Sequence, residues 1–157
     1  MNDIAPDTGR RLAATGLRYE DVAIGDWFDT PARHVGTELI DAFADLTGDR
    51  FEIHMDDDAA RAHGFPSRVA HGLLILSLVD GLKNQAQARF LAIASLGWNF
   101  RFECPVLAGD TIAARVGIRD KRTTSRPDRG ILILGFCVRK QTGDIVQSGE
   151  NQLMVYR

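Results

Sequence analysis

Residues 47–77 read TGDRFEIHMDDDAARAHGFPSRVAHGLLILS, and this stretch holds the start of a long apolar helix together with most of the reactive polar residues. The dipeptide His71-Gly72 opens a run that is apolar at almost every position as far as Val79. A helix that is apolar nearly all round is expected to be buried. The sequence therefore predicts a central helix over residues 71–85, which the rest of the chain must enclose.

The sequence after this helix has the alternation of β-strands. Apolar and polar residues alternate over 96–106, and again over 112–118, while residues 131–138 are apolar on both faces and 145–156 form a last alternating segment. Gly109 and Gly143 lie in the turns between them. These segments predict four antiparallel strands, and a sheet wrapped on one long helix is an α+β architecture.

The sequence before the central helix predicts one strand near 27–35 and one amphipathic helix. Thr37 is a candidate N-cap for this helix, and Leu39, Ile40, Phe43 and Leu46 recur at helical spacing. Gly48 is expected to end it. Asp49 should therefore lie in a loop just past a helix C-terminus.

Length and composition bound the class of protein. A chain of 157 residues with a net charge of -2 suits one domain and argues against a general nucleic-acid binder. No apolar run approaches the roughly 18 residues of a membrane span, so we expect no membrane partner and a cytoplasmic location. Cys104 and Cys137 lack metal-ligand spacing and are expected to be free, buried thiols. Residues 1–18 are expected to form a flexible arm before a domain over 19–157.

Two groups of residues in 47–77 could carry chemistry. Asp49 and His54 offer a carboxylate and an imidazole, whose reference pKa values differ by about two to three units, so that they could divide base and acid work. The N–H of Gly72 offers a fixed partial positive charge at a helix start. Asp49 alone could equally be a turn residue. The acidic run 56–58 lacks the ligand spacing of a calcium loop, so we expect a helix cap there and no metal.

The order of these elements resembles the hot-dog fold, and the motif resembles that of the MaoC-like, or (R)-specific enoyl-CoA hydratase, family. That motif runs Gly-Asp-any-Asn-Pro-aliphatic-His, followed some 15 to 20 residues later by aliphatic-Ala-His-Gly. Here Gly48-Asp49 and Ile53-His54 stand in the first part, and residues 69–72 form the second.

The resemblance covers about residues 19–157 and implies a single hot-dog domain that acts on acyl-CoA thioesters. It implies reversible hydration of an enoyl-CoA, or dehydration of a 3-hydroxyacyl-CoA. Asp49 and His54 would activate the water, and the Gly72 N–H would polarise the thioester. No cofactor is expected beyond the CoA of the substrate.

Three positions depart from the family pattern. Phe51-Glu52 replaces Asn-Pro, and Asp80 stands where the family often carries serine, with Ser77 one turn earlier. We expect Phe51 to pack into the domain or line the acyl pocket, and Glu52 to face solvent or pair with an Arg. The candidates for the substrate pocket are Phe51, Glu52, His71, Ser77 and Asp80, although His71 could instead fix the start of the helix.

Other expectations concern CoA, assembly and competing functions. Arg122, Arg126 and Arg129 could meet CoA phosphates, or belong to a solvated loop. Residues 131–138 are apolar on both faces, and one helix can cover only one of them. We therefore expect at least a homodimer. A thioesterase using Asp49, or a non-catalytic acyl-CoA binding module, are the alternative functions.

Overall fold

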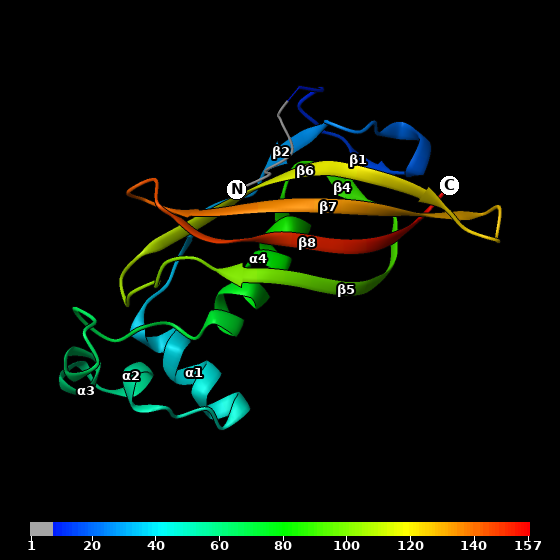
Figure 1. Cartoon of the computed structure of the whole chain (residues 1–157). Coiled ribbons are helices and arrows are strands. Elements are labelled where there is room, and N and C mark those ends of the chain that lie inside the picture. The colour runs from blue at the N-terminus through cyan, green and yellow to red at the C-terminus, as the bar shows by residue number, and fades with distance from the viewer. Residues whose placement is uncertain (1–7) are drawn as a thin grey trace.

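The computed structural model describes residues 8–157, in which a curved antiparallel sheet lies across one long helix (Figure 1). The short elements before that helix are β1 (Thr15–Leu17), the 3-10 helix η1 (Tyr19–Asp21), β2 (Trp27–Asp29), β3 (Arg33–His34), α1 (Thr37–Thr47), α2 (Glu52–Met55) and α3 (Asp57–Ala62). The long helix and the strands after it are α4 (Gly72–Gln85), β4 (Arg89–Phe90), β5 (Ala92–Phe102), β6 (Thr111–Thr123), β7 (Arg129–Lys140) and β8 (Ile145–Tyr156).

The main sheet has the strand order β2-β6-β7-β8-β5, and β3 also pairs with β6. Every pairing in it is antiparallel. The core lies between this sheet and α4, with Ile75 and Val79 of the helix fully enclosed beside Val116, Leu134 and Phe136 of the strands. The predicted α+β arrangement, a sheet wrapped on a central helix, is confirmed.

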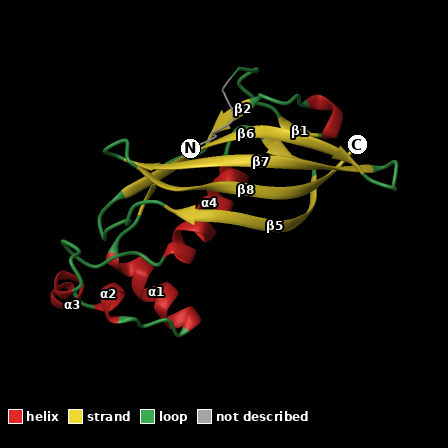
Figure 2. Ribbon diagram, viewed as in Figure 1, coloured by secondary structure: helices red, strands yellow, loops and turns green. Residues whose placement is uncertain are grey.

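Helices α1, α2 and α3 gather at one end of the sheet, beyond the start of α4 (Figure 2). The chain returns from α3 to α4 through residues 63–71, where Val69 bonds to the backbone of Ile53 and Ala70 to that of Val106. The residues of the two-part motif are therefore brought together at this end of the sheet.

The central helix is not buried on all sides. Leu73 is 61% exposed and Ser77 is also exposed, although Leu74, Ile75, Val79 and Leu82 are enclosed. The prediction of complete burial was wrong because the sheet covers only one side of α4 within the chain.

Strand β7, by contrast, is covered on both faces by its own chain. Residues Leu132 to Val138 are all buried. On the outer face the side chain of Arg119 lies over Gly135, where a Cβ atom would meet it at 2.3 Å, and Arg119 pairs with Glu150 at 3.2 Å. The apolar run of β7 is therefore no argument for a second subunit.

The expected flexible arm is ordered where the structure describes it. β1 pairs in parallel with β4, and Leu12 and Leu17 are buried in the core. The carboxylate of Asp26 accepts bonds from the backbone N–H groups of Arg10 and Ala23. The prediction for residues 1–18 was wrong over 8–18, because contacts distant in sequence dock them, and positions 1–7 lie outside the described residues.

Two local predictions also need correction. Helix α1 begins at Thr37 with Gly36 as its N-cap, so Thr37 is not the cap. Strand β5 ends at Phe102, which leaves Cys104 exposed in the loop that follows, whereas Cys137 is buried as expected. Among residues 8–157, no helix has the length and apolar character that crossing a bilayer requires.

Candidate functional site

The site begins where α1 ends. Gly48 takes a left-handed conformation with φ of 78°, and its N–H bonds to the carbonyl of Ala44. This reversal places Asp49 in the predicted loop, where its carboxylate accepts a bond from the N–H of Phe51 at 3.2 Å. The short helix α2 then carries His54.

His54 is held so that one ring nitrogen remains available for chemistry. Its Nδ1 lies 2.6 Å from the carbonyl oxygen of Val69, and a carbonyl can only accept, so Nδ1 carries the proton. In the neutral ring Nε2 therefore keeps its lone pair. Arg68, a residue that the motif did not single out, donates from Nε to the carbonyl of His54 at 2.6 Å and fixes the turn of α2.

Burial is the main cause that lowers the pKa of His54 below its ordinary value, and the neighbouring His71 and Arg68 lower it further. The bond to Val69 and the nearby Asp49 act in the opposite direction but do not outweigh burial. His54 is therefore neutral near pH 7 and can accept a proton there.

His71 links the two halves of the motif. Its ring stacks on that of His54 with 3.8 Å between centroids, and its Nε2 donates to the carbonyl of Asp49 at 2.8 Å. The structural role predicted for His71, through a hydrogen bond, is therefore present, but the acceptor is the Asp49 loop.

Asp49, His54 and His71 each offer an atom within 4.8 Å of the others, which raises the question of a metal ion. The rings of His54 and His71 are stacked, only 28° from parallel, and stacked rings are poorly oriented to direct their in-plane lone pairs at one ion. His54 and His71 also each use one nitrogen on a backbone carbonyl. This arrangement favours proton transfer over metal binding.

A cavity of about 250 Å³ opens beside His54, whereas Asp49 and His71 lie near His54 but are not among the residues that line it. His54 and Gly72, the first residue of α4, both lie in its wall. Gly72 also allows the ring of Phe102 to lie against the helix start, since a Cβ at position 72 would meet that ring at 2.2 Å. The remaining lining residues are Phe65, Val69, Ala70, Ile75, Phe102, Glu103, Cys104, Pro105, Val106, Val146 and Gln147.

Val146 and Gln147 of β8 lie in this wall because of an irregularity in the sheet. Val138 pairs with Gln147 but Arg139 pairs with Ile145, so Val146 is an extra residue, a β-bulge. Both Val146 and Gln147 are thereby buried in the cavity wall. Sequence reasoning missed Gln147, because a bulge in an otherwise alternating strand leaves no clear periodic signal.

Phe51 is placed differently from the prediction, whereas Glu52 is placed as predicted. Phe51 is 53% exposed and does not line the cavity. The centroid of its ring lies 6.1 Å from that of His54 and 5.8 Å from that of His63. Glu52 faces solvent, as predicted, but its carboxylate pairs at 2.6 Å with Nε2 of His63 and not with an Arg. The expected helix cap at 56–58 is confirmed, since Asp56 accepts from the N–H of Ala59.

Ser77 and Asp80 lie further along α4, away from His54. Ser77 donates to the carbonyl of Leu73 and lines a different cavity of about 300 Å³, near Ala32 and Gly81. The carboxylate of Asp80 pairs with Lys83 at 2.7 Å. Neither residue lines the cavity of His54, because each turn of α4 carries the chain further from its start.

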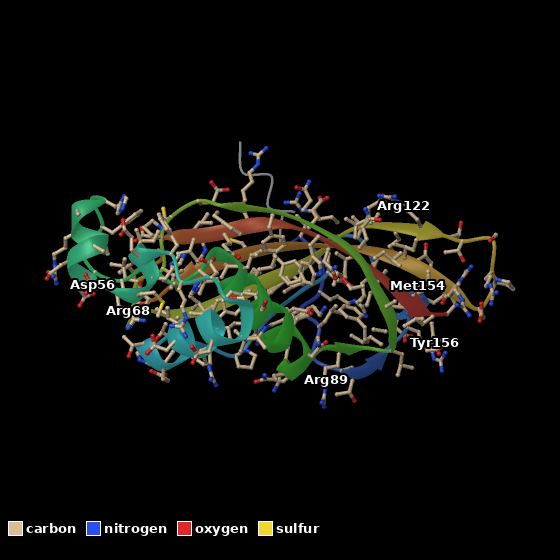
Figure 3. All side chains as sticks on the ribbon, turned by 90° about the horizontal axis from the view of Figure 1, so that it is seen from below. Asp56, Arg68, Arg89, Arg122, Met154 and Tyr156 are labelled. Atoms are coloured by element: carbon tan, nitrogen blue, oxygen red, sulfur yellow. The ribbon has the colours of Figure 1, made fainter. Side chains whose placement is uncertain are left out.

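The arginines proposed for CoA phosphates lie at the opposite end of the sheet. Figure 3 shows Arg122 and Tyr156 at one end and Arg68, which bonds to His54, at the other. Arg129 pairs in register with Tyr156, and β8 spans about 30 Å from there to Gln147 at about 3.3 Å per residue. Arg122, Arg126 and Arg129 are thus not brought to the cavity of their own chain.

Comparison with known proteins agrees with this geometry. Residues 21–131 match the model of the MaoC like domain. The chain is 31% identical to the (R)-specific enoyl-CoA hydratase of Aeromonas caviae over 76% of its own length and 85% of the relative's. It is 40% identical to Protein MaoC of Klebsiella aerogenes over 66% of its length, but spans only 31% of that protein.

The solved structure of a MaoC-like dehydratase from Rhodospirillum rubrum superposes with a TM-score of 0.83 at 28% identity, covering 90% of this chain and 98% of the other. The sheet wrapped on α4 is the hot-dog fold that the sequence predicted. With the family match spanning both parts of the motif, the chain belongs to the MaoC-like dehydratase and hydratase family.

Proposed function

We propose that this protein is a hydro-lyase that adds water reversibly across the double bond of an enoyl-CoA thioester to give a 3-hydroxyacyl-CoA. The observation that carries the proposal is that His54 and Gly72, the first residue of α4, lie in the wall of one cavity. His54 is neutral with the lone pair of Nε2 available, and Asp49 lies close to its ring. The similarity to an (R)-specific enoyl-CoA hydratase supports it.

Hydration needs a base for water, a proton for C2 and a donor for the thioester oxygen. In the proposed reaction Asp49 and Nε2 of His54 hold the water, and the pair removes one proton as the water oxygen bonds to C3. The π electrons move toward the thioester, and the pair returns the proton to C2. Dehydration runs through the same groups in reverse.

The start of α4 supplies the third requirement. The first four N–H groups of a helix have no partner within it, and they carry partial positive charge. Gly72 is the first residue of α4 and lines the cavity. Its N–H is the proposed donor to the thioester oxygen, where negative charge develops as C3 is attacked.

Product analysis tests the proposal against its alternatives. With crotonyl-CoA we expect the enoyl absorbance to fall as 3-hydroxybutyryl-CoA forms, without release of a CoA thiol. Release of free thiol would support a thioesterase instead. Binding of the thioester without either change would support a non-catalytic module. A panel of straight, branched and dicarboxylic enoyl-CoAs would then identify the preferred acyl chain.

The pH dependence of kcat/KM should reflect the lowered pKa of His54. The neutral imidazole is the active base, so activity is present above its pKa and is lost as the pH falls through it. Because burial lowers that pKa, we expect the acid limb to lie below about 6.5, the ordinary imidazole value. Initial rates measured across the pH range would check this, and an acid limb above 6.5 would contradict the assignment.

We also propose a homodimer, with support from the free edge of the sheet. Within residues 8–157, β5 is the last strand of the main sheet and pairs with β8 alone, and Leu96 of β5 is 47% exposed. Pairing such edges removes unsatisfied backbone groups. Light scattering at micromolar concentration should give about twice the chain mass of 17.3 kDa. A monomer would exclude the dimer, and Leu96→Lys should lower the measured mass if β5 forms the interface.

A further inference from the structure

Gln147 is a buried amide in the wall of the cavity that the proposed chemistry does not use. It is 2% exposed and lines the same cavity as His54 and Gly72. Its Nε2 donates to the carbonyl oxygen of Gly72 at 2.7 Å. The side chain therefore connects the bulge of β8 to the first turn of α4.

This hydrogen bond assigns the positions of the nitrogen and the oxygen of the Gln147 amide. A carbonyl oxygen only accepts hydrogen bonds, so the amide nitrogen must face Gly72 and the amide oxygen must face away from it. Oε1 is buried and has no hydrogen-bond donor within residues 8–157. A buried acceptor without a donor is costly, so the group that satisfies it is expected to come from the molecule in the cavity.

We propose that Oε1 of Gln147 accepts a hydrogen bond from the C3 hydroxyl of the bound 3-hydroxyacyl thioester, and from the attacking water in the hydration direction. This inference rests on the proposed function of the site and adds a recognition residue to it. An amide oxygen can take only a donor at this position, so it would disfavour a carboxylate there.

The proton count agrees with this role. Water brings two protons to the cavity: the Asp49 and His54 pair removes one, and the other stays on oxygen as the hydroxyl proton of the product. A hydrogen bond from that retained proton to Gln147 orients the lone pair of the water toward C3. In dehydration the same proton leaves with the water, so the contact lasts through the reaction in both directions.

The test separates recognition of the hydroxyl from support of Gly72. Affinities for 3-hydroxybutyryl-CoA and butyryl-CoA are measured by calorimetry in an Asp49→Asn chain, which prevents turnover, with and without Gln147→Met. Met has a similar length and no acceptor of comparable strength. We expect the affinity for 3-hydroxybutyryl-CoA to fall by about three- to tenfold, the usual worth of one hydrogen bond. The affinity for butyryl-CoA, which lacks the hydroxyl, should change less than twofold.

Asn151 provides a matched control on the same strand. It is also a buried amide whose nitrogen donates to a backbone carbonyl, that of Gly97, and whose oxygen has no donor within residues 8–157, but it does not line the cavity. Asn151→Leu should leave the ratio of the two affinities unchanged, whatever it does to the melting temperature.

Equal losses for both ligands in Gln147→Met would show that the residue only positions Gly72, and would overturn the inference, as would no loss for either. Failure of both ligands to bind the Asp49→Asn chain that retains Gln147 would also overturn it. Failure of the proposed function is recognised by a different measurement, the hydration of enoyl-CoA by the unsubstituted protein. If that reaction is absent, the binding of the two ligands can still be compared.

Discussion

His54→Ala is expected to lower kcat/KM for enoyl-CoA hydration by about 10²–10⁴-fold, the usual contribution of a positioned acid-base group. The structure holds the neutral ring by Nδ1 on the carbonyl of Val69, which leaves the lone pair of Nε2 available, and Asp49 lies close to the ring. Alanine removes the base and leaves every backbone element in place. Asp49→Asn should cause a comparable loss, because a neutral amide has neither the negative charge nor the basicity of a carboxylate.

The matched control is His63→Ala. His63 lies close by and also contacts the ring of Phe51, but it is more exposed and bonds to Glu52 instead of lining the cavity. Its substitution should leave the rate within a small factor of the original. Melting curves would show that all three variants fold. Full activity in folded His54→Ala or Asp49→Asn would contradict the catalytic assignment.

Gly72→Pro should lose about 10²–10³-fold more activity than Gly72→Ala, the usual cost of one oxyanion donor. Proline removes the N–H yet is tolerated at the first position of a helix. The residue before it, His71, has φ of -56° and ψ of 133°, which suits a following proline. Comparing kcat/KM for the two variants therefore isolates the N–H from other effects of a larger residue.

Both substitutions add a Cβ that meets the ring of Phe102, so this shared effect must be separated. Phe102 is 56% exposed, and its ring can move outward. Phe102→Leu alone, and combined with Gly72→Ala, would measure what displacement of the ring costs. Equal activity of Gly72→Ala and Gly72→Pro would mean that the N–H of Gly72 does not stabilise the thioester oxygen.

The fold could be predicted because its signals are local and repeated. The apolar run after His71-Gly72 and the alternation in the later strands each depend on neighbours in sequence, and both elements formed as expected. The loop position of Asp49 followed from Gly48, whose left-handed conformation glycine adopts at little cost. These features required no knowledge of distant contacts.

The incorrect predictions concern features that local sequence patterns do not determine. Residues 8–18 have little periodicity, and pairing with β4 far along the chain orders them. The positions of Ser77 and Arg122 relative to the cavity depend on how far an element carries the chain, which spacing from a motif does not give. Phe51 was expected inside because it is apolar, but a short helix leaves its ring on the surface against two histidines.

The bulge at Val146 has a consequence for how this protein could diverge. A bulge adds one residue to a strand without changing which strands pair, so a single-codon insertion or deletion at this point alters the cavity wall while the sheet remains. Loss of Val146 would remove one apolar side chain and leave Gln147 opposite Val138. Substrate preference could therefore drift among descendants of this gene by changes in length, which comparisons restricted to substituted positions would overlook.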